Sequence, residues 1–215
     1  MTTTFAGLKA KLLLMLDDEV QVVDSKTVGV NYVNPDHLQN AIDNAIDAIL
    51  PWWPKPKKAT IPTGVTEYAL PTDFYKVNAV GEDSTKMFLE PANLFASYGY
   101  GDDNCKWMQY PSGSLTLTKA LTDTATLFYS SKWGKPASET AVLETPTFLD
   151  FGLCLSAAHY LLLASATTAS DIRQWLSKMD QGLPIHNPRK DMSVHFYEIF
   201  LIEMSKLPNG SGGGR

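Results

Sequence analysis

The sequence predicts an α+β fold in which helices from both chain ends form one bundle, with a small antiparallel β-domain inserted between them. Two observations lead to this prediction. Apolar residues recur at helical spacing in residues 3–49 and 148–204, whereas residues 60–133 hold short β-rich runs separated by turn residues. We expect the bundle halves at 1–58 and 137–206, the β-domain at 59–136, and a flexible C-terminal tail at 207–215.

Composition limits the classes of function. The 215 residues are 44% hydrophobic and 19% charged, which is typical of a globular protein with a substantial core. The formal net charge of −5 argues against a protein whose main task is to grip nucleic acid, since that task needs a basic surface. The two cysteines are too few for a disulfide framework or a zinc site, and we expect free thiols.

Two helices are predicted before the β-rich region. Phe5, Leu8, Leu12 and Met15 have helical spacing and indicate a first helix over residues 3–17. After a valine-rich connector, Asn34-Pro35 is a helix start signal, with Asn as N-cap and Pro at the first helical position. The helix that follows carries one apolar stripe, formed by Leu38, Ala41, Ile42, Ala45, Ile46 and Ile49. Prolines at 51 and 54 end it.

The middle region predicts five or six short strands. The runs are TEYALP, FYKVNAV, TKMFLEP, KWMQY, SLTLT and TATLFYS, and turn residues separate them. Pro71 follows the first run and ends that strand, because proline has no N–H to donate to a sheet. Residues 95–110 contain a glycine- and aspartate-rich loop with aromatic neighbours.

Helices are expected again from Thr147 onward. Residues 148–169 are apolar and long enough to suggest a membrane span, but Asp150 and His159 interrupt them, and a buried helix is the better interpretation. Its expected inward face is Phe148, Phe151, Leu155, His159, Leu162 and Leu163. Ser170 is a cap for a shorter helix, and Asn187-Pro188 starts a last one, with Met192 among its expected inward residues. The ending LPNGSGGGR is too rich in glycine to be helical.

No pattern indicates catalysis, a metal or a cofactor. The four histidines include no pair at the three- or four-residue spacing that brings two ligands to one helix face. Gly99-Tyr100-Gly101 is not followed by the lysine-bearing helix of a phosphate loop, and there is no Gly-x-Ser-x-Gly elbow. We therefore predict that the protein is not an enzyme and has no catalytic, cofactor-binding or metal-binding residues.

Aromatic residues give the candidate interface. Trp52 and Trp53 stand between prolines at the exit from the second helix, and a polar loop is surrounded by four more aromatics: Tyr98, Tyr100, Trp107 and Tyr110. Aromatic side chains are enriched in the cores of protein interfaces, which favours a protein that works by contacting other proteins. The alternative for Trp52 and Trp53 is that they fill the joint between bundle and β-domain.

The order of several motifs resembles the head–tail adaptor proteins of tailed bacteriophages, also called connectors or gatekeepers, including the tail tubular protein A type of short-tailed phages. The matching positions are Tyr68, Leu70, Pro71, Asp73 and Phe74, then Leu115 and Leu117, then Phe128 and Tyr129, then Lys135-Pro136. With the order of elements they cover about residues 34–180. The segment SSKWG interrupts the usual strand before the Lys-Pro pair.

The resemblance implies a virion structural protein in the neck between head and tail, assembled in the host cytoplasm. Its implied partners are the portal protein, the tail, nozzle or next connector protein, and further copies of itself in a ring, typically a dodecamer. Genome DNA would pass through the ring during packaging and ejection without sequence-specific binding, and no membrane is implied. The C-terminal segment would reach toward the portal, with Leu207, Pro208 and Arg215 as its contact residues.

A second function stays open at this stage. The protein could instead be a monomeric binding module whose β-domain binds a peptide or glycan through the aromatic loop 95–110. A monomer that ignores portal would favour this alternative over the adaptor.

Overall fold

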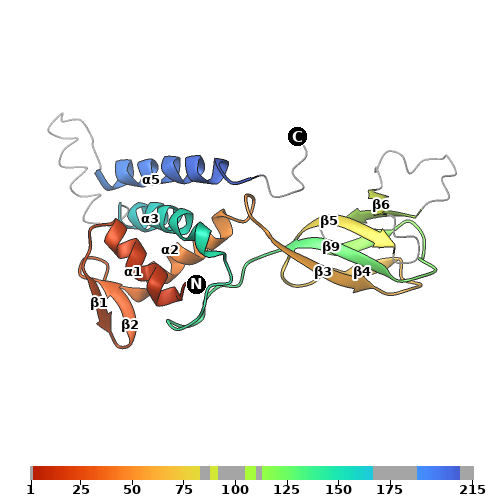
Figure 1. The fold of residues 1–215 in the computed structure, drawn as a ribbon, viewed down its shortest axis with the longest axis horizontal. Coiled ribbons are helices and arrows are strands. Elements are labelled where there is room, and N and C mark those ends of the chain that lie inside the picture. Colours follow the sequence, from red (N-terminus) through yellow and green to blue (C-terminus); the bar gives the residue numbers. More distant parts are fainter. Residues whose placement is uncertain (1, 83–87, 92–104, 110–112, 167–187, 209–215) are drawn as a thin grey trace. The chain divides into compact units, whose positions relative to one another are not determined.

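The computed structural model describes residues 2–82, 88–91, 105–109, 113–166 and 188–208 (Figure 1). The chain divides into two compact units. One, here called the helical unit, comprises Met1–Trp53 and Trp133–Gly213, and the other, the β-unit, is built on Pro54–Lys132. The chain thus leaves the helical unit after residue 53 and returns to it at residue 133, whereas the limits expected from sequence were 58 and 136.

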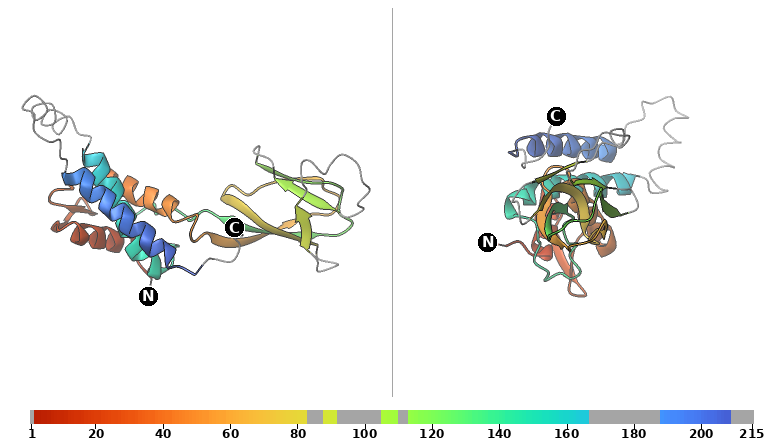
Figure 2. Two further views of the ribbon diagram at one scale, coloured as in Figure 1. Left: turned by 90° about the horizontal axis from the view of Figure 1, so that it is seen from above. Right: turned by 90° about the vertical axis from the view of Figure 1, so that its right-hand side faces the viewer.

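The helical unit is organised around one central helix. Its helices are α1 (Phe5–Met15), α2 (Pro35–Ala48), α3 (Asp150–Ala166) and α5 (Pro188–Ser205), with a 3-10 turn, η1 (Thr147–Leu149), just before α3. Helices α1, α2 and α5 each pack against α3, and α5 runs along it in Figure 1 and Figure 2. Fully buried side chains from α1, α2 and α3 form the centre of the core: Leu8, Leu12, Leu38, Ile42, Ile46, Leu153 and Ala157.

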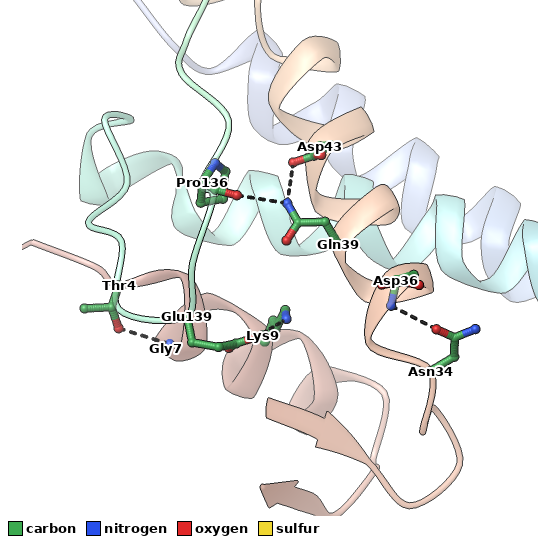
Figure 3. Close-up of polar contacts among 9 residues, drawn as sticks. All are labelled: Thr4, Gly7, Lys9, Asn34, Asp36, Gln39, Asp43, Pro136 and Glu139. Carbon is green, nitrogen blue, oxygen red and sulfur yellow. Dashed lines mark hydrogen bonds and ion pairs between the residues drawn. The ribbon is translucent and has the colours of Figure 1, made fainter. Parts of the chain in front are cut away.

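Local signals place the first two helices. The Thr4 side chain caps α1 by accepting a hydrogen bond from the Gly7 N–H at 3.2 Å. Asn34 caps α2 by accepting from the Asp36 N–H at 2.9 Å, with Pro35 at the first helical position (Figure 3). The predicted start of α2 and its buried stripe are confirmed.

The segment that returns from the β-unit is tied to α1 and α2. Gln39 of α2 donates to the Pro136 carbonyl at 3.1 Å and to Asp43 at 2.9 Å, and Lys9 of α1 forms an ion pair with Glu139 (Figure 3). The Phe5 N–H donates to the carbonyl of Ala141. These contacts join the two ends of the helical unit across a long separation in sequence.

A hairpin that the sequence did not reveal lies between α1 and α2. Its strands β1 (Val20–Val23) and β2 (Lys26–Gly29) pair antiparallel around Asp24 and Ser25, which both have positive φ, of 50° and 63°. That pair of angles is characteristic of a tight hairpin turn. The valine-rich connector expected from sequence is therefore a strand pair.

The β-unit is one seven-stranded sheet. Its strands are β3 (Lys55–Ile61), β4 (Glu67–Ala69), β5 (Phe74–Glu82), β6 (Phe88–Pro91), β7 (Lys106–Gln109), β8 (Ser114–Leu117) and β9 (Ala125–Ser131), in the order β3-β9-β5-β6-β7-β8-β4. All neighbours are antiparallel except β6 and β7, which pair in parallel. The sheet encloses its own core, formed by residues such as Ile61, Val80, Leu115, Leu117, Leu127 and Tyr129.

The LPTDF motif forms the turn between β4 and β5. The Phe74 N–H donates to the Pro71 carbonyl at 3.0 Å, and the Asp73 carbonyl accepts from the Lys132 N–H at 2.7 Å. The Asp73 carboxylate is paired with Lys57, which holds the pKa of Asp73 below its ordinary value. The motif thus joins three segments of the sheet, and its role within the β-unit is structural.

The predicted architecture was wrong. We expected a helical bundle carrying a small antiparallel β-domain. The structure instead has a β-unit formed by a curled, mixed, seven-stranded sheet, and a helical unit that also contains a hairpin. The parallel β6–β7 pair was missed because local patterns do not determine whether two consecutive strands pair parallel or antiparallel. Strand β3 (Lys55–Ile61) was not among the predicted runs, because proline and lysines are poor strand formers, although both are acceptable on an edge strand such as β3.

Helix α3 is a core helix of the helical unit. Residues Thr147–Ser165 are long and apolar enough to cross a membrane by length and composition, but 61% of that stretch is buried within the structure. Its inward face differs from the expected one, because Phe148, Phe151 and Leu163 are 55%, 53% and 41% exposed. The shorter helix expected after Ser170 lies outside the described residues.

Candidate interaction surfaces

The two tryptophans at the exit from α2 have different environments. The Trp53 carbonyl accepts a hydrogen bond from the Trp133 indole N–H at 2.8 Å, and the Trp53 ring meets the Phe148 ring edge-on at 5.2 Å. Trp53 therefore packs against the core of the helical unit. Trp52 is 38% exposed and stays available for a partner.

Of the aromatic residues around the polar loop, only Trp107 is described. Its indole N–H donates to the Leu89 carbonyl at 3.0 Å, and its side chain packs against the core of the β-unit. This hydrogen bond links β7 to β6, so the indole of Trp107 has a structural role within the sheet. Tyr98, Tyr100 and Tyr110 lie outside the described residues.

The three candidate contact residues of the C-terminal segment also differ in their environments. Leu207 is half-buried against the core of the helical unit, and its N–H donates to the Met204 carbonyl at 3.1 Å. Pro208 is exposed. Arg215 lies outside the described residues. Leu207 thus belongs to the end of α5 rather than to a separate tail.

The outer side of α5 exposes large apolar side chains between its polar ones. Its inner side packs on α3 through Phe200 and Met204, which are buried. Away from that side, Val194, Leu201 and Ile202 are 48%, 37% and 55% exposed. Apolar side chains beyond the buried stripe of a helix are commonly covered by a second contact. Helix α5 therefore has the composition of a helix at an interface.

A second apolar surface is a groove between α1 and the start of α3. It has a volume of about 570 Å³ and is lined by Lys11, Leu14, Met15, Thr147, Phe148, Asp150, Phe151 and Cys154. Leu14 on its wall is 70% exposed. The groove is open and shallow enough to leave large apolar side chains in water, which is unfavourable for an isolated subunit.

Polar groups in the groove come from one ion pair. Lys11 donates to Asp150 Oδ2 at 2.6 Å, and the Thr3 hydroxyl donates to the same oxygen at 2.5 Å. Asp150 Oδ1 is buried and has no hydrogen-bond partner among the described residues. Burial, with the nearby Asp150 carboxylate, raises the pKa of the Cys154 thiol to about 12, so this cysteine is not a nucleophile.

A polar contact fixes α5 on α3. Ser193 is fully buried, and its hydroxyl bonds His159 Nδ1 at 2.9 Å and donates to the His159 carbonyl at 3.0 Å. The Tyr197 ring lies 4.8 Å from the His159 ring. His159 thus lies between α3 and α5 with its ring hydrogen-bonded to Ser193, which agrees with its predicted place on the inward face of α3.

Within the described part of the chain, no three histidine, cysteine or acidic side chains gather as a metal-binding group. A smaller hollow of about 320 Å³ lies between α2 and α3 and is lined by His37, Asn40, Ala41, Asn44, Tyr160, Leu161, Leu163 and Ala164. Burial raises the pKa of Tyr160, so its hydroxyl stays protonated at neutral pH.

Sequence reasoning missed both apolar surfaces. It took Phe148 and Phe151 as core residues and Met192 as inward, whereas Met192 is 48% exposed. The signal that was available is that the apolar residues of α5 extend beyond one stripe, to Val194, Leu201 and Ile202.

Comparisons with known proteins add no assignment: no family model matches the chain, and no curated protein matches it significantly.

Proposed function

We propose that the chain is a virion structural protein of a tailed bacteriophage, namely a head-to-tail adaptor. Copies of it would form a ring, with twelve as the expected number, between the portal and the tail or next connector protein. The ring would form part of the channel for DNA during packaging and ejection. The protein would act in the neck of the virion, after assembly in the host cytoplasm, and would not be an enzyme.

The observation that carries the proposal is the outer side of α5. Val194, Leu201 and Ile202 are exposed there, although the helix already buries a full apolar side on α3. Such a surface is expected in a subunit that completes its burial in an assembly. The motif order around Pro71, Asp73 and Lys135-Pro136 supplies the particular assembly, through its resemblance to adaptor proteins.

The charge of the chain is consistent with a channel. With a net charge of −5, the protein has weak electrostatic attraction for a phosphate backbone, and DNA can move past it without being held. The DNA contacts of such a ring would be independent of base sequence.

The alternative of a monomeric binding module at loop 95–110 gains no support from a specific contact. Trp107, the one described aromatic of that group, uses its indole N–H inside the sheet. We therefore retain the adaptor as the single proposal.

The proposal is tested by mixing the purified full chain with portal-bearing phage heads and imaging the product. We expect a ring of added density below the portal. A chain truncated to residues 1–207 keeps Leu207 on its core, so its melting temperature should be unchanged while its attachment to heads weakens. A full-length protein that stays monomeric and ignores portal at every concentration would refute the proposal.

A further inference from the structure

The two apolar surfaces of the helical unit lie on opposite sides of α3. On one side, Gly152 faces Met204 of α5 and His159 contacts Ser193 of α5. On the other side, Phe151 and Cys154 line the groove with α1. Figure 1 shows α5 and α1 on different sides of α3. One subunit therefore presents a ridge and a groove in different directions.

The shapes of the two surfaces are complementary. The exposed residues of α5 that we call the α5 strip are Val194, Glu198, Leu201 and Ile202. Their spacing of four, seven and eight residues places them on one face of the helix, so they form a ridge. The groove is the hollow between α1 and α3 described above. An amphipathic helix that lies in an apolar groove is a common mode of protein recognition.

The charges of the two surfaces are also complementary. Glu198 is an exposed acid at the middle of the strip, and Asp191, seven residues earlier on the same face of α5, is exposed as well. Lys11 is 53% exposed on the wall of the groove. Lys11 also pairs with Asp150, but the Asp150 side chain is only 8% exposed, so the ammonium is the exposed charge of that pair. The exposed charge of the ridge is thus acidic, and that of the groove is basic.

We propose that the α5 strip of one copy of this chain occupies the α1–α3 groove of the next copy. In this contact Leu201 and Ile202 cover Leu14, Phe148 and Phe151, and Glu198 meets Lys11. The pairing follows from the two surfaces themselves and rests on the proposed function only for the closure of the resulting array into a ring.

Symmetric pairing of like surfaces is disfavoured. Two α5 strips packed antiparallel would bring their Glu198 carboxylates together near the twofold axis, and like charges at an interface are costly. Two grooves facing each other would leave a void. A ridge-to-groove contact between opposite sides of the subunit repeats from copy to copy, and such a contact generates rings or filaments.

The contact is expected to be weak for a single pair. One helix face is smaller than the roughly 800 Å² per partner of a stable interface. Association should therefore rise with protein concentration, and a neighbouring ring that gathers many copies should favour it.

Cysteine cross-linking tests the pairing directly. The native Cys105 and Cys154 are both buried and free, so engineered thiols at exposed positions are the reactive ones. A Leu14→Cys variant mixed with an Ile202→Cys variant should give mixed dimers under mild oxidation. The double variant should give a ladder of higher oligomers. Both positions are exposed, so the melting temperatures should match the unmodified chain.

Controls separate specific from random contacts. The control for Leu14→Cys is Val22→Cys, because Val22 is 72% exposed and lies on the hairpin, away from the groove. Mixed with Ile202→Cys, it should give only background dimers. Adding Glu198→Lys to the Ile202→Cys chain should lower the yield of mixed dimers at least fivefold. The same charge change at the exposed Glu67 of the β-unit should leave the yield unchanged.

Two outcomes would overturn the proposal: dimers of Ile202→Cys with itself as the main product, or mixed dimers no more abundant than the Val22→Cys background. Attachment to portal-bearing heads is measured separately. A chain that forms rings on portal without the Leu14–Ile202 cross-link refutes the ridge-to-groove contact and leaves the adaptor function intact. A chain that forms the cross-linked ladder and ignores portal refutes the adaptor function and leaves the ridge-to-groove contact intact.

Discussion

The ion pair between Lys9 and Glu139 should be the most sensitive polar contact of the helical unit. Lys9 is only 2% exposed, and its ammonium also lies 4.2 Å from the centre of the Phe5 ring. Glu139 is 18% exposed, and its second carboxylate oxygen has no hydrogen-bond partner among the described residues. The pair connects α1 to the segment that returns from the β-unit, so its loss should affect the whole unit.

Replacing Lys9 by Met keeps most of the side-chain volume and removes the charge. Glu139 then stays largely buried with neither carboxylate oxygen paired, and removal of one partner of a buried pair costs about 3 to 5 kcal/mol. We expect Lys9→Met to lower the free energy of unfolding by an amount near the lower end of this range, because Glu139 is 18% exposed and keeps some contact with water. Replacing both residues, as Lys9→Met with Glu139→Leu, should return the free energy of unfolding to within about 1 kcal/mol of the original, since no charge remains buried.

The assay is urea denaturation monitored by the helical signal in far-UV circular dichroism, which reports on the helical unit. A matched control is Lys135→Met, because Lys135 and Asp47 form an exposed pair, at 46% and 52% exposure, worth less than about 1 kcal/mol. With Glu139→Leu measured alone as well, the double-mutant cycle gives the coupling free energy between Lys9 and Glu139. If Lys9→Met costs no more than Lys135→Met, the pair is not buried in solution and the reasoning fails.

Three further predictions concern other parts of the chain. Gly29→Ala should cost about 1 to 3 kcal/mol in thermal or urea unfolding, because the added Cβ would stand 1.8 Å from the buried carboxylate of Asp18; an unchanged stability would contradict that packing. Asp73→Asn should weaken the acid dependence of β-unit stability. Because the folded pKa of Asp73 is lowered, its carboxylate stabilises the fold fully above the pKa of an unfolded aspartate, about 4. This contribution is lost as the pH falls through the lower folded pKa. An acid-unfolding curve that Asp73→Asn leaves unaltered would refute the prediction. Ile46→Asp should cost several kcal/mol because Ile46 is 1% exposed, whereas Asp47→Lys should change the melting temperature little; equal melts would show that the buried face is misassigned.

A related expectation about the thiols needed correction. From the sequence alone, the position of Cys105 beside a polar loop predicts a thiol that reacts in the native protein. Cys105 is only 7% exposed, and its thiol donates to the Lys119 carbonyl at 3.3 Å, so both cysteines should resist alkylation until the protein is denatured.

Local signals in the sequence were sufficient for some elements. The Asn34-Pro35 start and the stripe through Leu38, Ile42 and Ile46 determine α2, since a cap and a helical apolar period act over only a few residues. The turn at Pro71 was equally local, because a missing N–H ends a strand whatever lies around it.

The tertiary structure decided what those signals cannot reach. The hairpin at Asp24-Ser25 uses positive φ without glycine, and the consecutive strands β6 and β7 pair in parallel, a direction that their own residues do not specify. Apolar periodicity shows which faces avoid water, but it does not show what covers them. Phe151 and Ile202 carry the same signal as a core residue, and they lie exposed because α3 already has its neighbours on the other sides. Whether an apolar face becomes core or interface depends on the packing of distant segments, and no local pattern records that packing.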